Sequence, residues 1–221
     1  MKNVRAIDHL CLLALLFSPL LSGADLSTYR GFQFGMNLNS AVKHSGMDAS
    51  EVATIHERPA RIQELNWRPA RFSSATSDPV EQVLFSFYNG QLSRIVIDYD
   101  NEKTDGLTPE DMIKAISARY GVAKRPAAET VLPSASFSEG VTVMALWEDA
   151  EYSFNLTESP YGSRFELIAF AKHLDGLAQT AIADGAHLDE QQAPERLKTQ
   201  EQDVRDQQQR ARLINQERFR P

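Results

Sequence analysis

Cysteine is nearly absent from this 221-residue chain, since Cys11 is the only one. It lies in an apolar run near the N-terminus, so a chain without that run has no disulfide, thiol nucleophile or thiolate metal ligand. Catalytic motifs such as Gly-x-Ser-x-Gly, His-Glu-x-x-His and the glycine-rich phosphate loop are also missing. We therefore predict no catalytic residue, no cofactor and no metal site.

Long apolar runs are scarce as well. The run from Leu10 to Leu21 has twelve residues, whereas a helix needs ~20 to cross a bilayer. It follows Lys2 and Arg5 and leads to the small residue Ala24, the order typical of a signal peptide. We expect a signal peptide over residues 1–24 and a periplasmic or secreted chain without a transmembrane span. An uncleaved interfacial anchor is the alternative.

Positive charge is in the minority. The formal net charge is −7, and removal of residues 1–24 would leave 21 basic and 29 acidic residues, or −8. Such a balance argues against a nucleic-acid partner unless the basic residues cluster. One cluster exists, because the segment 57–72, "ERPARIQELNWRPARF", contains Arg-Pro-Ala-Arg twice, with a tryptophan beside the second copy.

This arginine-rich segment is the candidate binding site. Guanidinium groups bind carboxylates and phosphates in a bidentate manner, and an indole adds a stacking surface. If the chain turns between the copies, they share one surface; if it is extended, roughly 33 Å separates them and no small anion meets both. Alternatively, the prolines only end local elements and the arginines brace them. The candidate residues are Arg58, Arg61, Trp67, Arg68 and Arg71.

Two acidic stretches have a catalytic or metal-binding alternative. Residues 98–106, "DYDNEKTDG", partly match a calcium loop, but Lys103 stands where that loop requires glycine. Glu148, Asp149 and Glu151 are close enough in sequence to include a carboxylate acid–base pair. We favour solvated turns in both places.

The clearest local pattern is a β-hairpin of residues 80–88 and 91–99. Asn89-Gly90 suits a two-residue turn that needs positive φ at both positions. Counting outward predicts that Phe87 faces Leu92, Phe85 faces Arg94 and Val83 faces Val96, with Leu84, Ile95 and Ile97 on the other face.

A helix is predicted over residues 109–120. Thr108 is a good N-cap, Pro109 suits the first turn, and Gly121 ends the helix. Further helices are expected at residues 39–45 and at 48–57, where Asp48 would be the cap. Strands are expected at residues 31–36, 64–67, 129–137, 141–149, 152–158 and 164–171.

The fold class that follows is α+β, an antiparallel sheet with helices packed on one side and a charged C-terminal helix or tail. Residues 25–183 are predicted to form one domain, and an internal pseudo-repeat within it is an open alternative. Residues 184–221 are rich in glutamine and charge, so we expect a helical or disordered tail. Leu197, Val204 and Ala211 are seven residues apart, but the polar Gln200 and Gln207 between them favour a single exposed helix over a coiled coil.

Residues 31–46, "GFQFGMNLNSAVKHSG", and 83–99, "VLFSFYNGQLSRIVIDY", resemble small exported bacterial α+β proteins. That group includes the outer-membrane assembly lipoprotein BamE and the β-lactamase inhibitor protein. The resemblance covers residues 31–99, and this chain departs from it by lacking the lipidated cysteine and by adding a second helix–strand set and the tail. It implies a binding or assembly role in the envelope and carries over no functional residue.

The sequence therefore predicts a non-catalytic binding or assembly module of the bacterial cell envelope. Its partner would be another envelope protein or an anionic ligand. Two alternatives stay open, namely an enzyme with a site of dispersed polar residues and an adaptor that acts through its tail. The oligomeric state is not predicted.

Overall fold

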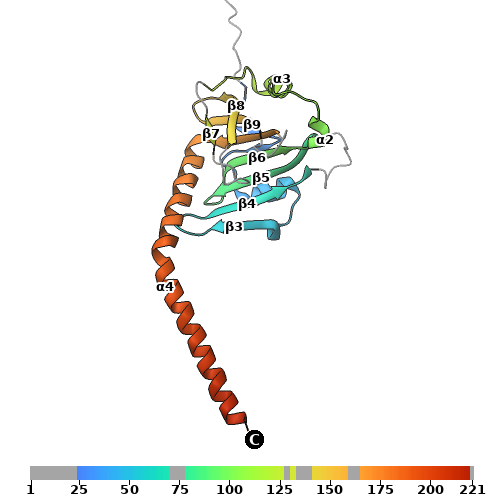
Figure 1. Ribbon diagram of the computed structural model, residues 1–221. Helices are drawn as coiled ribbons and strands as arrows, with labels where there is room; N and C mark the ends of the chain where they lie inside the picture. Colours follow the sequence, from blue (N-terminus) through green and yellow to red (C-terminus); the bar gives the residue numbers. More distant parts are fainter. Residues whose placement is uncertain (1–23, 70–77, 127–129, 133–140, 159–164, 220–221) are drawn as a thin grey trace, which may run out of the picture.

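The computed structural model describes residues 24–69, 78–126, 130–132, 141–158 and 165–219 (Figure 1). The predicted signal peptide, except Ala24, and the candidate Arg71 lie outside these residues. Among the described helices, none is both long and apolar enough to span a membrane.

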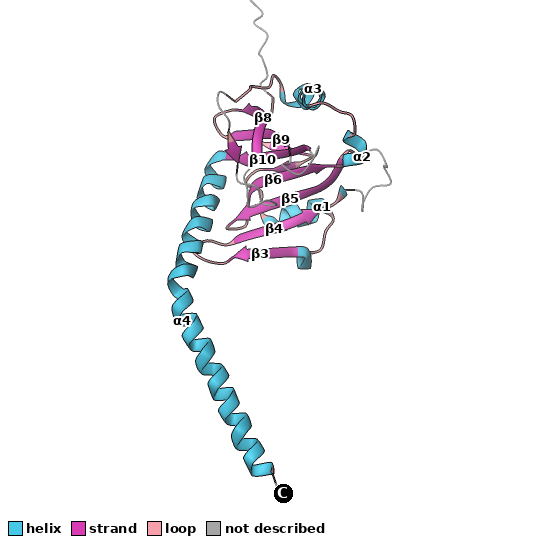
Figure 2. Cartoon of the chain, in the orientation of Figure 1, coloured by secondary structure: helices cyan, strands magenta, loops and turns pink. Residues whose placement is uncertain are grey.

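An eight-stranded antiparallel sheet forms the body, with strand order β3-β4-β5-β6-β10-β9-β8-β7 (Figure 2). A small hairpin of β1 (Thr28–Tyr29) and β2 (Phe32–Gln33) precedes it. The helices are α1 (Leu38–Ser45), α2 (Asn101–Thr104), α3 (Pro109–Tyr120) and α4 (Lys172–Arg218). The sheet strands are β3 (Val52–His56), β4 (Ile62–Trp67), β5 (Val80–Tyr88), β6 (Gln91–Tyr99), β7 (Val131–Leu132), β8 (Val141–Glu148), β9 (Tyr152–Glu158) and β10 (Phe165–Ala171).

The order of elements repeats once along the chain. Helix α1 precedes the four strands β3 to β6, and α3 precedes the four strands β7 to β10. The last strands of the two sets, β6 and β10, pair at the centre of the sheet. From that pair towards each edge, the strands of both sets follow in reverse chain order, β6 to β3 on one side and β10 to β7 on the other. The topology therefore supports the pseudo-repeat that the sequence left open.

Helices α1 and α3 pack on one face of the sheet, which makes the predicted α+β class correct. Ala41 of α1 and Met112 and Ile116 of α3 belong to the same buried cluster as Phe85 and Phe154 of the sheet. The buried Trp147 of β8 joins the layers, since its Nε1 donates to Ser117 Oγ at 3.2 Å and to the carbonyl oxygen of Gly121 at 3.0 Å.

Both of the strongest local predictions are confirmed. Asn89 and Gly90 have φ of 47° and 79° and join β5 to β6, as the turn requires. Thr108 caps α3 reciprocally with Asp111, and Pro109 is the first helical residue.

The predicted register of the hairpin is wrong beyond its first pair. Phe87 faces Leu92. One residue further from the turn, Ser86 of β5 faces Arg94 of β6, so Ser93 is an extra residue in β6. Its hydroxyl donates to the carbonyl oxygen of Ser86 at 3.0 Å, which stabilises this bulge. One extra residue in a strand moves every later side chain of that strand to the opposite face of the sheet.

The consequence is that the apolar residues of β6 gather on the core face. Phe85 faces Ile95 and Val83 faces Ile97, and all four are buried in the main cluster. Leu84 faces Val96 on the other face, so only Leu84 of the three residues predicted there is placed correctly.

The predicted helix over residues 48–57 is also wrong. Asp48 does form a capping box, but with a single 3₁₀ turn, Ala49–Glu51, and the chain then continues as β3. The β-branched Val52, Thr54 and Ile55 suit an extended strand, which β4 is available to pair. The first Arg-Pro-Ala-Arg copy therefore follows a strand rather than a helix.

Helix α4 continues without interruption from the end of β10 to Arg218, so the C-terminal segment is helical. It runs past the ends of the strands (Figure 1) and buries Asp175, Ala178, Ala181 and Gly185. A Cβ atom added to Gly185 would lie 3.1 Å from the carbonyl oxygen of Arg58, which explains the glycine at this close approach. The packed part of the helix thus reaches Gly185, two residues beyond the predicted boundary.

Candidate functional site

Arg58 and Arg61 of the first arginine copy are not brought together with Arg68 of the second. Arg58 and Arg61 are exposed in the turn between β3 and β4, whereas Arg68 is exposed just beyond the other end of β4. Since β4 is extended, the seven residues from Arg61 to Arg68 span roughly 23 Å. Of the two arrangements considered for this segment, the extended one is observed.

Trp67 is partly buried and packs against the core rather than forming an exposed stacking surface. Its ring centroid lies 5.4 Å from that of Phe32 and 6.2 Å from that of Phe85. Arg68 donates to Gln82 Oε1 at 3.4 Å. The backbone N–H of Arg61 donates to Asn89 Oδ1 at 3.0 Å, which ties the β3–β4 turn to the next hairpin.

Both acidic stretches have structural roles. Asp100 caps α2 by accepting from the backbone N–H of Glu102 at 2.9 Å. No group of three or more His, Cys, Asp or Glu side chains within the described part of the chain is arranged to hold a metal ion.

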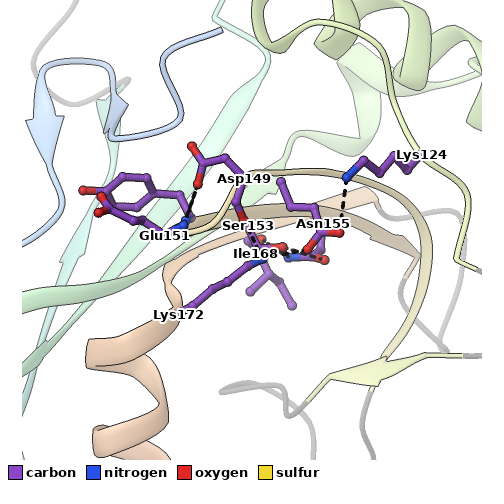
Figure 3. A network of polar contacts seen from close by, with 9 residues as sticks. Lys124, Asp149, Glu151, Ser153, Asn155, Ile168 and Lys172 are labelled. Atoms are coloured by element: carbon purple, nitrogen blue, oxygen red, sulfur yellow. Dashed lines mark hydrogen bonds and ion pairs between the residues drawn. The ribbon is translucent and has the colours of Figure 1, made fainter. Parts of the chain in front are cut away.

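The acidic residues of the β8–β9 turn anchor the start of α4 (Figure 3). Lys172 Nζ donates to Glu148 Oε2 at 2.8 Å and to the carbonyl oxygen of Asp149 at 2.7 Å. This contact lowers the pKa of Glu148. Asp149 Oδ1 accepts from the backbone N–H groups of Glu151 and Tyr152 at 2.8 and 2.7 Å. A carboxylate held ionised in this way is a poor general acid near neutral pH.

A pocket of about 440 Å³ lies between helices α2 and α3 and the sheet. Its residues come from β1, the start of β5, the end of β6, both helices and β10. The pocket adjoins the end of β6 and the start of β5, whereas α4 passes their opposite ends. Its apolar wall consists of Pro79, Val80, Leu107, Met112, Ala115, Ile116 and Leu167.

Three tyrosines, Tyr29, Tyr99 and Tyr120, also line this pocket. Burial raises the pKa of all three phenols, so each is a neutral hydroxyl and a potential donor at physiological pH. The Tyr120 hydroxyl is buried and makes no well-formed hydrogen bond to a described residue, and the Arg119 guanidinium near it acts to lower the pKa of the phenol. An unsatisfied buried hydroxyl costs about 1–3 kcal/mol, so a ligand in the pocket that bonded to the Tyr120 hydroxyl would remove that cost.

Three cationic side chains and Thr104 complete the lining. Arg30 makes a bidentate ion pair with Asp78 at 2.7 and 2.8 Å, and Lys103 Nζ donates to the carbonyl oxygen of Asp78 at 2.7 Å. Arg119 is exposed, and no carboxylate of the described chain lies within ion-pair distance of it. Its guanidinium carbon is 5.6 Å from the ring centroid of Tyr120. We call these residues, with the three tyrosines, the tyrosine pocket.

Sequence reasoning missed this site. Tyr29, Tyr99 and Tyr120 are far apart in the sequence, and no motif links them. It also missed a carboxylate pair, the buried Glu166 of β10 and the partly exposed Asp98 of β6, which face each other across the two strands. Burial, followed by the charge of Asp98, raises the pKa of Glu166 to about 7. Because Glu166 is only 5% exposed, we assign this pair to the fold rather than to a site.

Comparison with known proteins does not assign a family, because no family model, curated protein or solved structure matches this chain.

Proposed function

We propose that this protein is a non-catalytic binding module of the bacterial cell envelope, and that the tyrosine pocket binds an organic anion with an apolar body. The observation that carries the proposal is the buried Tyr120 hydroxyl, which makes no well-formed hydrogen bond in the described chain, in an apolar pocket beside Arg119. Ligand pockets commonly combine apolar walls with a few placed polar groups.

The polar groups of the pocket suit an anion. Neutral phenols donate hydrogen bonds, and a guanidinium adds charge and further donors. Arg30 already has Asp78, so Arg119 is the cation best placed to meet an incoming carboxylate. The apolar wall would hold the rest of the ligand by burial from water.

The lining argues for binding over catalysis. Of the residues that the structure describes around the pocket, none is histidine, cysteine, aspartate or glutamate. Phenols with raised pKa are poor bases at neutral pH, and arginine is a poor proton shuttle. The envelope location rests on the predicted signal peptide and on the resemblance to exported α+β proteins.

Replacing Tyr120 with phenylalanine should weaken binding without loss of stability. We use decanoate as the ligand and measure its displacement of a fluorescent apolar anion, anilinonaphthalene sulfonate. A hydrogen bond to a charged group contributes about 1.5–3 kcal/mol, so affinity for decanoate should fall roughly 10- to 100-fold. The thermal stability of the ligand-free variant should be nearly unchanged, because the phenol makes no well-formed hydrogen bond to a described residue.

Arg119→Gln tests the charge, with Arg125→Gln as the matched control. Arg125 is 77% exposed, does not line the pocket and makes a long 3.4 Å contact with Glu110. Arg119→Gln should weaken decanoate about fivefold and leave methyl decanoate unaffected, because a partly solvated ion pair contributes about 1 kcal/mol. Equal effects of the two substitutions, or equal affinity for the acid and the ester, would contradict the proposal.

A further inference from the structure

Beyond Gly185, α4 leaves the body of the protein. All residues from 186 to 219 are exposed except Gln192, which is half-buried, and the helix visibly projects from the sheet (Figure 1). At ~1.5 Å per residue, residues 186–218 extend roughly 50 Å. Helices in proteins are stabilised mainly by packing of an apolar face. A projecting helix of this length therefore raises the question of what packs on it.

One stripe of this helix repeats every seven residues. Its positions are separated alternately by four and three residues, which is the spacing of the contact positions of a coiled coil. The stripe, called here the α4 seam, consists of Ala193, Leu197, Gln200, Val204, Gln207, Ala211 and Ile214. Leu197, Gln200, Glu201 and Val204 line a shallow hollow on the helix. Four residues in this arrangement form the hole that receives a side chain of a partner helix.

We propose that the α4 seam joins two copies of this chain as an antiparallel coiled coil. In the register that aligns the largest apolar residues, Leu197 of one copy lies level with Ile214 of the other. The same register places Val204 level with Gln207, so each Gln meets an apolar residue rather than a second Gln. The proposal does not depend on the tyrosine pocket.

The charges beside the seam favour the antiparallel direction. In this register, Arg196 of one copy faces Glu217 of the other, and Asp203 faces Arg210. The two-fold symmetry of the pair repeats each contact, so four attractive pairs and no repulsive pair flank the seam. Arg196 would exchange its exposed contact with Asp189, at 2.8 Å within the same helix, for the contact between copies.

In a parallel pair, the same charged residues would form fewer attractive pairs between the copies. Arg196, Asp203 and Arg210 would then each face the residue five places further along the second copy. Arg196 would meet Glu201, but Asp203 would meet Gln208 and Arg210 would meet Asn215. Gln200 and Gln207 would also each face the same glutamine of the second copy across the seam. The sequence is thus self-complementary mainly in the antiparallel direction, which identifies a second copy as the partner.

The length of the exposed helix fits this register. Phe219 of the second copy would lie level with Gln192, seven residues beyond the last packed residue, Gly185. This leaves about 10 Å of helix between Phe219 of the second copy, the last described residue, and the body. The two bodies would stand at opposite ends of the paired helices without collision.

The first test compares two leucines of the same helix. Leu197 lies in the seam and Leu213 does not, although their exposures, 60% and 58%, are nearly equal. We expect sedimentation of the full chain across the micromolar range to give a dimer. Leu197→Glu should raise its dissociation constant at least ~100-fold, since the loss occurs twice. Leu213→Glu should change it less than ~3-fold.

The second test fixes the direction. Asp203→Arg should raise the dissociation constant roughly tenfold by facing Arg210 of the second copy with a like charge, and adding Arg210→Asp should restore the original value. In a parallel pair, both substitutions face neutral side chains and should have little effect. A monomer at high micromolar concentration, equal effects of the two leucine variants, or no effect of Asp203→Arg would each overturn the proposal.

Discussion

Replacing Asp175 with alanine is expected to lower the free energy of unfolding by about 3–5 kcal/mol, because it removes one partner of a buried ion pair. Asp175 of α4 accepts from Arg94 of β6 through both carboxylate oxygens, each at 2.7 Å. The two side chains are only 6% and 9% exposed. Without the carboxylate, the Arg94 guanidinium remains buried without its main counter-charge. Thermal and denaturant unfolding would measure the loss.

A matched control lies further along the same helix. Asp189 also forms an ion pair, with Arg196 at 2.8 Å, but these side chains are 59% and 57% exposed. Its replacement with alanine should cost at most about 1 kcal/mol, because water screens an exposed pair. Replacing Arg94 and Asp175 together by methionine and leucine should recover most of the lost stability. A loss for Asp175→Ala no larger than that for Asp189→Ala would show that the pair does not hold α4 against the sheet.

The elements that the sequence predicted well are those specified by a few adjacent residues. Asn89-Gly90 and the Thr108–Pro109–Asp111 cap each determine their own backbone, because the required φ values and hydrogen bonds are local. The same local reasoning failed at Asp48, whose capping box is satisfied by a single 3₁₀ turn. There the pairing of β3 with β4, a contact between segments, decides the structure of the following residues.

The tyrosine pocket and the ion pair of Arg94 could not be read from the sequence for the same reason. Arg94 and Asp175 are 81 residues apart, and their contact depends on where β10 ends beside β6. The Ser93 bulge moves Arg94 away from the core face, where a regular hairpin would pair it with Phe85, and pairs it with Ser86 instead. In both cases the position follows from the order of strands in the sheet, which local periodicity does not determine.

Glu166 should make the protein less stable as the pH rises from about 5 to 8. Burial and the nearby Asp98 raise the pKa of Glu166 to about 7, above its ordinary value of 4.5. Between these values the folded state holds a proton that the unfolded state has released. Stability therefore falls as the pH rises through this range, and the full cost is present above the folded pKa. At 1.36 kcal/mol per pKa unit, the cost is about 3 kcal/mol.

Replacing Glu166 with glutamine should remove this dependence. The amide keeps the shape and the donor of the protonated acid but cannot ionise, so the variant should be more stable than the parent at pH 8 by about 2–3 kcal/mol and nearly equal to it at pH 5. Glu158→Gln is the control, because Glu158 is exposed at the end of the adjacent strand β9. It should leave the difference between pH 5 and pH 8 unchanged. If Glu166→Gln instead destabilised the protein equally at both pH values, the carboxylate would be ionised in the fold and its contacts, such as the 3.3 Å bond from Thr157 Oγ1, would be stabilising.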